Sequence, residues 1–149
     1  MFTRAERRYV ESARIGRLAT ADTEARPHAV PVCFAFMGEK IVSAIDEKPQ
    51  RAPTDGLRRS RDIEANPRVA LLVDHYTEDW DRLGWVQVRG TAGHVKPTEA
   101  PHAAGIAALR EKYEQYADHD LESRPLVRID PGSVQSWGVL ERPREEERS

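Results

Sequence analysis

The sequence has few of the residues that mark several large protein classes. It has one cysteine among 149 residues, which excludes an internal disulfide framework and any zinc or iron–sulfur site built from several cysteines. No apolar run reaches the roughly 18 residues of a membrane-spanning helix. Neither sign of charge dominates, because 23 Lys and Arg face 25 Asp and Glu, whereas a general nucleic-acid binder carries a basic excess. We therefore expect no membrane and no nucleic-acid partner.

The length and the ends of the sequence suggest a simple organisation. A chain of 149 residues fits one domain, which we place at residues 1–149, and it buries a core without cross-links. Residues 141–149 are rich in charge, so we expect a frayed tail. The first twelve residues are charged throughout and do not resemble a signal peptide. We therefore expect a cytoplasmic protein.

Much of the chain is patterned for strands. Short polar turns between the first stretches are typical of an antiparallel meander. Pro31, inside the second stretch, indicates an edge strand or a bulge. The apolar or alternating stretches are residues 17–21, 28–37, 41–45, 68–75, 85–92, 126–129 and 133–137.

Helical signals flank these strands. A capping box of Thr3 with Glu6 begins a short helix that we expect to end at Gly16. A second helix is expected to stop at Asn66–Pro67. No βαβα alternation appears, so the predicted fold is mainly β with flanking helices, an antiparallel barrel of six or seven strands. The third helix is expected within residues 97–119, where the apolar stripe is Ile106, Leu109, Tyr113 and Tyr116.

Positive charge is concentrated in one segment. Residues 48–61 hold five Lys and Arg against Asp55 as the one acid. Cations near the start of a helix are poorly placed, because the helix dipole is already positive there. An anion bound by arginines and helix N–H groups would account for them. The alternative is a solvated basic face balanced by Asp62 and Glu64.

No pattern identifies a catalytic side chain, so catalytic residues remain unknown. The five histidines lack ligand spacing, and we predict no metal site. Cys33 lies in an apolar stretch, where a free cysteine usually acts as a small hydrophobe. An enzyme with this sequence would need its chemistry from a cofactor, and the basic segment suggests one with a phosphate. Trp137, after an expected turn at residues 130–132, would stack on a flat cofactor or pack in the core.

Several stretches resemble, in order and spacing, the split-barrel flavin and deazaflavin oxidoreductases, which are the pyridoxamine-phosphate-oxidase-like proteins. The resemblance covers nearly the whole chain. It implies an FMN-binding type of split β-barrel and a homodimer with two cofactor sites at the subunit interface. It also implies FMN or coenzyme F420 as the cofactor. The stretches are GRLAT (16–20), RPHAVPVCF (26–34), LRRSRDIEANPRV (57–69), WVQVRG (85–90) and residues 126–138.

Within this family the sequence is most similar to an F420-dependent actinobacterial branch. True pyridoxamine phosphate oxidases end in a basic R-x-H type motif, which is absent after Trp137. FMN has a single phosphate and would not need five cations, which favours F420. We therefore expect hydride transfer from reduced F420 to a small unsaturated organic substrate. The alternatives are an FMN-dependent oxidase or reductase and a non-catalytic binder of flavin, F420 or haem, with His28, His75 or His94 as haem ligand.

Ten residues are the expected cofactor contacts. Arg59, with Arg58 beside it, matches the family's phosphate-binding position. The backbone of residues 31–33 matches the strand that lines the ring. Lys48 and Arg51 have no fixed family role, and we expect them to reach the anionic tail of F420. The full set is Thr20, near the ring, Pro31, Val32, Cys33, Ser43, on the phosphate or tail, Lys48, Arg51, Arg58, Arg59 and Trp137.

Overall fold

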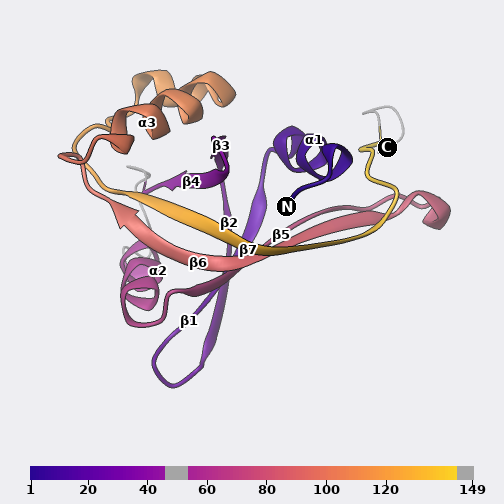
Figure 1. The fold of residues 1–149 in the computed structure, drawn as a ribbon, viewed down its shortest axis with the longest axis horizontal. Coiled ribbons are helices and arrows are strands. Elements are labelled where there is room, and N and C mark those ends of the chain that lie inside the picture. The colour runs from indigo at the N-terminus through magenta and orange to yellow at the C-terminus, as the bar shows by residue number, and fades with distance from the viewer. Residues whose placement is uncertain (46–53, 144–149) are drawn as a thin grey trace.

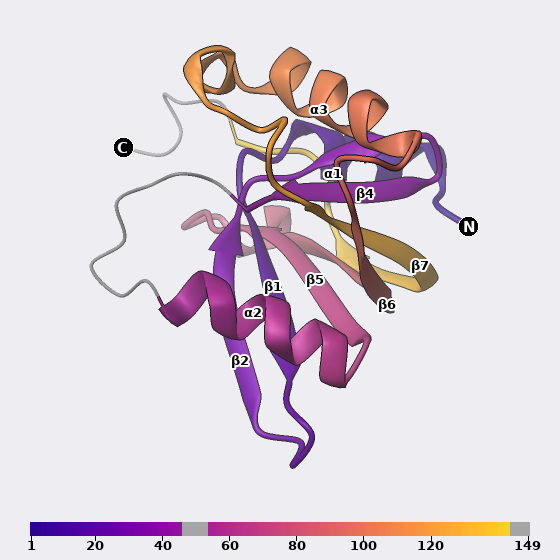
Figure 2. The ribbon, with the colours of Figure 1, turned by 90° about the vertical axis from the view of Figure 1, so that its left-hand side faces the viewer.

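The computed structural model describes residues 1–45 and 54–143 and shows one curled antiparallel sheet with three α-helices (Figure 1). The strand order is β2-β1-β5-β6-β7-β4-β3. The first and last strands of this order follow each other in the chain, so the sheet curls back toward itself as a split barrel (Figure 2). This confirms the predicted fold class, with seven strands. The elements are α1 (Arg4–Ser12), β1 (Gly16–Ala21), β2 (Pro27–Val32), β3 (Ala35–Met37), β4 (Lys40–Ala44), α2 (Thr54–Ala65), β5 (Arg68–His75), β6 (Gly84–Val95), α3 (Pro101–Lys112) and β7 (Leu126–Gly138), with short 3₁₀ turns at Trp80–Arg82 and Glu114–Asp118.

The first helix begins as predicted but ends earlier. The backbone N–H of Thr3 donates to Glu6 Oε1 at 2.9 Å, and Glu6 N–H donates to Thr3 Oγ1 at 3.0 Å, which completes the capping box. The expected end at Gly16 is wrong, because α1 stops at Ser12 and Gly16 opens β1. A Cβ on Gly16 would lie 2.8 Å from Leu71 Cδ1. Gly16 therefore allows Leu71 to pack closely against the backbone of β1, and it does not end a helix.

The long apolar stretch 28–37 forms two strands instead of one. Strands β2 and β3 lie at opposite edges of the sheet, and Cys33 and Phe34 join them. The backbone N and O of Phe34 lie 3.1 and 3.0 Å from the hydroxyl of Tyr113. This hydroxyl takes the place of a partner strand where the ladder is interrupted. The expectation that Pro31 lies on an edge strand is confirmed.

The last two predicted strands are one strand, β7, interrupted by a bulge. Arg89 pairs with Ser133 and Gly90 pairs with Pro131, so Gly132 has no opposite residue. A Cβ on Gly90 would lie 2.1 Å from the carbonyl oxygen of Asp130. The sequence Asp-Pro-Gly therefore bends a continuing strand. The expected turn at residues 130–132 is wrong.

The helices cover two apolar cores. Helix α2 ends before Asn66–Pro67 as predicted and contributes Ile63 to the barrel core, which also contains residues of α1. Helix α3 is shorter than the predicted range, so Tyr113 and Tyr116 of the predicted stripe lie beyond its end at Lys112. All four residues of the stripe are nevertheless buried in the second core. Within residues 1–45 and 54–143, no helix has both the length and the apolar character needed to cross a membrane.

Candidate functional site

A polar layer lies between α2 and the end of the β1–β2 pair. Thr20 is 3% exposed, and its Oγ1 donates to Asp62 Oδ2 at 3.2 Å. Asp62 is itself buried on α2, and its Oδ2 lies 3.8 Å from Nε of Arg58, one helical turn earlier. The i, i+4 spacing places these two side chains on the same face of the helix. A buried carboxylate needs such donors, because its removal from water is costly without them.

A pocket of about 500 Å³ opens beside this layer, between α2 and the β1–β2 turn. Three guanidinium groups and two carboxylates line it, and within the described ranges no residue forms an ion pair with Arg61. The backbone N–H of Arg26 donates to Asp22 and holds the pKa of that carboxyl below its usual value. An excess of guanidinium groups suits an oxyanion. The lining residues are Asp22, Thr23, Arg26, Arg58, Arg61, Asp62 and Ala65.

The expected ring-lining residues lie at the β2 edge. Pro31 is exposed on the outer face of β2, and Val32 is buried. Ser43 is 1% exposed on β4 and donates its hydroxyl to the carbonyl oxygen of Cys33 at 2.7 Å. The structure therefore brings Cys33 and Ser43 together and uses the Ser43 proton to fasten the β2–β3 link to β4.

The remaining expected contacts are separated. Arg59 is half-buried on α2, whereas Lys48 and Arg51 lie outside the described residues. Trp137 is 54% exposed and pairs with Trp85. His94 lies further along β6, the strand that contains Trp85, and its Nε2 is 3.1 Å from Ser60 Oγ of α2. The span from residue 85 to residue 94 is about 30 Å, so Trp137 does not meet the arginines of α2 within one chain.

Four charged residues that line this pocket are absent from the expected contacts, namely Asp22, Arg26, Arg61 and Asp62. Arg61 belongs to the basic segment and Asp62 is expected only as a balancing charge, whereas Asp22 and Arg26 have no predicted role. Asp62 could have been found from its i, i+4 spacing to Arg58. The pair Asp22 and Arg26 depends on a turn in which Ala25 has a positive φ of 62°. An alanine in the sequence does not predict this conformation, because residues with a side chain rarely adopt it.

The three histidines considered for haem have different surroundings. His75 uses both ring nitrogens, with Nδ1 2.6 Å from the Tyr9 hydroxyl and Nε2 2.7 Å from the Arg82 carbonyl oxygen. His28 Nε2 is buried and has no hydrogen-bond partner in the part of the chain that is described. Both ring nitrogens of His75 are therefore used in hydrogen bonds within the chain. Across residues 1–45 and 54–143, no three His, Cys, Asp or Glu side chains gather in an arrangement that would hold a metal ion.

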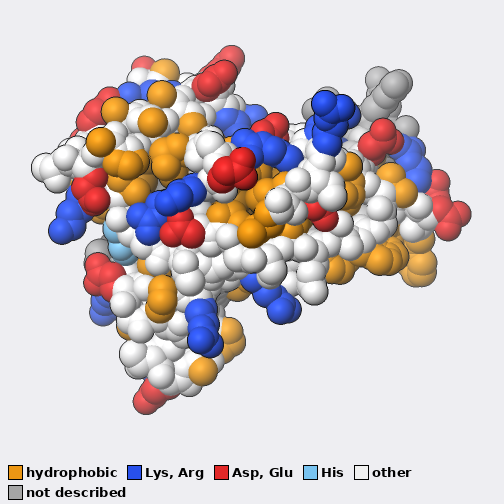
Figure 3. All heavy atoms as spheres, viewed as in Figure 1, with side chains coloured by type: hydrophobic (Ala, Val, Ile, Leu, Met, Phe, Trp, Pro, Cys, Tyr) orange, Lys and Arg blue, Asp and Glu red, His pale blue; other side chains and the backbone are white. Residues whose placement is uncertain are grey.

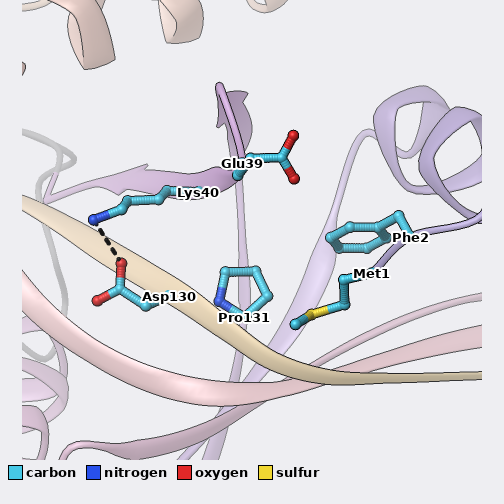
Figure 4. Close-up of a pocket in the computed structure, with 6 residues that line it drawn as sticks. All are labelled: Met1, Phe2, Glu39, Lys40, Asp130 and Pro131. Atoms are coloured by element: carbon cyan, nitrogen blue, oxygen red, sulfur yellow. Dashed lines mark ion pairs between the residues drawn. The ribbon is translucent and has the colours of Figure 1, made fainter.

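A second, smaller pocket of about 170 Å³ lies near the start of α1 (Figure 4). Met1, Phe2 and Pro131 give it apolar walls, and Lys40 Nζ lies 3.2 Å from Asp130 Oδ1 at its rim. Apolar side chains gather on this face between α1 and α3 (Figure 3). None of the eight expected contacts that lie in the described ranges lines this pocket.

One face of the sheet mixes small apolar side chains with charged and aromatic ones. The three helices pack into the two cores, and in the described chain no helix lies over the outward side chains of β1, β2, β5 and β6. The row of paired residues Asp74, Trp85 and Trp137 marks one end of this face. Its middle is formed by Ala19, Ala29, Pro31, Ala70 and Leu72, with Arg17 between Pro31 and Leu72 and with Gln87 and Arg89 beside them on β6.

Known proteins resemble this chain along most of its length. Residues 2–138 match the family model described as Pyridoxamine 5'-phosphate oxidase. The chain is 30% identical over 139 residues to a 5a,11a-dehydrotetracycline/5a,11a-dehydrooxytetracycline reductase of Streptomyces rimosus, spanning 93% of this chain and 84% of that protein. It is 34% identical over 117 residues to a pyridoxine/pyridoxamine 5'-phosphate oxidase of Rubrobacter xylanophilus, spanning 72% of this chain and 48% of that one. The crystal structure of a conserved hypothetical protein from Mycobacterium tuberculosis superposes with a TM-score of 0.67 at 28% identity, over 93% of this chain and 86% of that chain.

Proposed function

The chain belongs to the pyridoxamine 5′-phosphate oxidase family, and from that premise we propose an oxidoreductase that uses coenzyme F420 to reduce a small unsaturated organic molecule. The observation that carries the proposal is the family match over residues 2–138 together with the arginine-lined pocket beside α2. Such a pocket suits the phosphate of a flavin-type cofactor. When bound and reduced, this cofactor supplies a hydride.

Two relatives bear on the direction of the reaction. The chain covers 84% of a protein named as a reductase of dehydrotetracyclines, and the prefix dehydro denotes an unsaturated compound. It covers 48% of the oxidase relative and lacks a basic R-x-H type motif after Trp137. Reduction of an unsaturated substrate therefore fits better than oxidation of a vitamin B6 phosphate.

The residues of this chain bind and orient the cofactor. Arg58 and Arg59 hold its phosphate, and the backbone of Pro31, Val32 and Cys33 lines its ring. Ser43 donates its hydroxyl to the carbonyl oxygen of Cys33 at 2.7 Å, so its role is to hold the backbone that lines the ring. The hydroxyl of Thr20 donates to Asp62 of α2, so Thr20 affects the cofactor by positioning this helix. In this proposal the protein orients the ring and excludes water from the reacting atoms.

A homodimer completes the site in this proposal. The outer face of β1, β2, β5 and β6 offers Ala29, Pro31 and Leu72 to a second copy, with the ion pair of Arg17 and Asp74 among them. Interfaces between proteins commonly mix apolar and polar side chains in this way. Trp137 lies about 30 Å from the α2 end of its own chain. Packing of two outer faces about a twofold axis would bring Trp137 of the partner subunit to the cofactor.

Cofactor titration tests this function. Purified protein is titrated with F420 and with FMN, and binding is followed by fluorescence. We expect F420 to bind more tightly, and Arg59→Ala to weaken its binding by about 1.5–3 kcal/mol, the scale of a hydrogen bond to a charged group. Arg8→Ala, an exposed arginine on α1, is the matched control. Tighter binding of FMN, or a yellow protein as purified, would favour the FMN-dependent alternative.

A further inference from the structure

Helix α2 carries a serine and a carboxylate on a face that does not line the arginine-lined pocket. Ser60 and Glu64 are one helical turn apart, so the helical repeat places both on the same face. His94, near the end of β6, contacts this face from the sheet that α2 lies across (Figure 2). A serine, a histidine and a carboxylate in this order form the constellation that activates a serine nucleophile, and it recurs on unrelated folds.

The contact between Ser60 and His94 has the geometry of a nucleophile with its base. Ser60 Oγ lies 3.1 Å from His94 Nε2, which is within hydrogen-bond reach. When the serine hydroxyl donates to Nε2, the ring proton of the neutral imidazole lies on Nδ1. Nε2 is therefore placed to take the hydroxyl proton when Ser60 Oγ attacks an electrophile.

The other ring nitrogen of His94 faces a carboxylate. Nδ1 lies 3.9 Å from Glu64 Oε1, which is longer than a hydrogen bond and within ion-pair range once the imidazole is protonated. The residue opposite His94 on β7 is Val127, which is apolar and fully buried. In the part of the chain that the structure describes, Glu64 is the one charged group recorded in an ion pair with His94. Its carboxylate favours the imidazolium that forms when His94 accepts the serine proton.

The three side chains differ in exposure as a reactive site requires. The His94 side chain is 14% exposed, whereas Glu64 is 72% exposed and Ser60 is half-buried. A small molecule can therefore reach Ser60 Oγ from solvent, while the imidazole behind it is mostly shielded from water.

We propose that Ser60 and His94 are the catalytic residues of a second activity, the transfer of an acyl group from an activated ester to Ser60 and then to water, with Glu64 as a positioning residue. Ser60 Oγ attacks the carbonyl carbon, and His94 Nε2 takes the hydroxyl proton and passes it to the leaving group as the bond to that group breaks. Water then attacks the acyl-serine and gives a proton to the same nitrogen, which returns it to Ser60 Oγ as the carboxylic acid leaves. No cofactor takes part, so the inference is independent of the proposed function.

The place of Ser60 in α2 restricts the substrate class. Ser60 lies in the interior of the helix, where the backbone N–H groups donate to carbonyl oxygens one turn earlier and are not available to an oxyanion. Loss of a single oxyanion donor costs an acyl-transfer enzyme about 10²–10³-fold in rate. We therefore expect acyl groups whose leaving group is stable as an anion, such as phenyl esters and thioesters, and no turnover of alkyl esters or amides.

Two probes test the site in the absence of any cofactor. The full chain is incubated with p-nitrophenyl acetate, and release of p-nitrophenolate is followed by absorbance. A fluorophosphonate, which loses fluoride when a serine oxygen attacks its phosphorus, is added separately, and the labelled peptide is identified by mass spectrometry. We expect the label on Ser60, and a loss of rate of about tenfold or more in both Ser60→Ala and His94→Gln, because a general base contributes about 10²–10⁴-fold.

Matched changes elsewhere control for background reactions of the surface. Ser133→Ala, at an exposed serine of β7, and His119→Gln, at a histidine far from α2 in the chain, should both keep the rate of the unmodified protein. Ethyl acetate, an alkyl ester with the same acyl group, should give no turnover above the rate without protein.

Glu64→Gln tests the positioning role. Glutamine keeps the size and one oxygen of the side chain but removes its charge. The rate should rise with pH as His94 loses its proton, and the midpoint of this rise should move to lower pH in Glu64→Gln, because the charge that favours the imidazolium is gone. A purely structural role would change the rate without moving the midpoint, so an unmoved midpoint would overturn the role of Glu64.

Ser60→Cys separates loss of the nucleophile from loss of the fold. A thiol at this position still lies beside the base, so the acetyl group should be found on residue 60 of this variant, and thermal unfolding of each variant reports its stability. Equal rates for Ser60→Ala and the unmodified protein would overturn the proposal. A fluorophosphonate label on other serines but not on Ser60 would overturn it as well, whatever the protein's affinity for F420.

Discussion

At the scale of single residues, Lys112 has the most unusual surroundings. Its Nζ is buried without a hydrogen-bond partner in the described chain, and it lies 3.9 Å from the ring centroid of Phe34 and 5.4 Å from that of Tyr113. Burial, reinforced by the charge of Arg14, lowers its pKa to about 8. The sequence shows only a lysine at a helix end, because the aromatic surround comes from segments far apart in the chain.

This pKa has a direct consequence for stability. The unfolded chain has the ordinary lysine pKa of 10.5, so between pH 8 and 10.5 it binds more protons at this site than the folded chain does. The contribution of Lys112 to stability is therefore greatest above pH 10.5 and is lost as the pH falls through about 8. We expect Lys112→Met to stabilise the fold at pH 7 by about 1 kcal/mol, after allowance for partial exposure.

Chemical denaturation of both proteins at pH 7 and pH 10 provides the measurement. The difference in unfolding free energy between Lys112→Met and the unmodified protein should shrink at the higher pH. A variant that is less stable at pH 7 would show that the amine over the two rings is favourable in its charged form.

At the scale of elements, the break between β2 and β3 decides how the sheet curls. The Tyr113 hydroxyl lies 3.1 Å from Phe34 N, 3.0 Å from Phe34 O and 3.1 Å from Arg14 O. It thus fastens the β2–β3 link to the segments after α1 and α3. The apolar run 28–37 predicted one strand because hydrophobicity reports burial and does not report which partner satisfies the backbone.

Tyr113→Phe tests this contact. The change keeps the ring in the second core and removes the hydroxyl, which leaves buried backbone groups of Phe34 without their partner. We expect a loss of about 1–3 kcal/mol in unfolding free energy, the cost of an unsatisfied buried polar group. Urea denaturation measures it, with Tyr76→Phe, at an exposed tyrosine, as the matched control. Equal stability of the two variants would mean that the hydroxyl does not support the break.

At the scale of the whole molecule, the proposed homodimer uses the outer face of β1, β2, β5 and β6. Trp137 is 54% exposed at one end of the outer face, and the small residues Ala19 and Ala29 pair at its centre. Dimerisation through this face would bury both features and would bring Trp137 of the partner subunit toward the arginines of α2.

Ala29→Arg is the corresponding test. A long charged side chain on this face should convert a dimer to a monomer and weaken F420 binding, because each cofactor site would lose the partner's Trp137. Ala103→Arg, on the exposed side of α3, is the control and should remain dimeric. Light scattering after size-exclusion chromatography measures the mass. A monomeric unmodified protein, or a dimeric Ala29→Arg, would contradict this arrangement.

The sequence by itself determined the fold class, the capping box at Thr3, the end of α2 before Asn66–Pro67 and the burial of Ile106, Leu109, Tyr113 and Tyr116. These features rest on local backbone chemistry and on periodicity, which are readable along the chain. The bulge at Gly132, the break at Phe34 and the pairing of Asp62 with Thr20 were decided only by the tertiary structure. Each depends on atoms that approach from distant segments, and no local pattern encodes such an approach. The basic segment predicted an anion site, and the fold placed its Arg58 and Arg61 in a pocket with Arg26 of a turn far back in the chain.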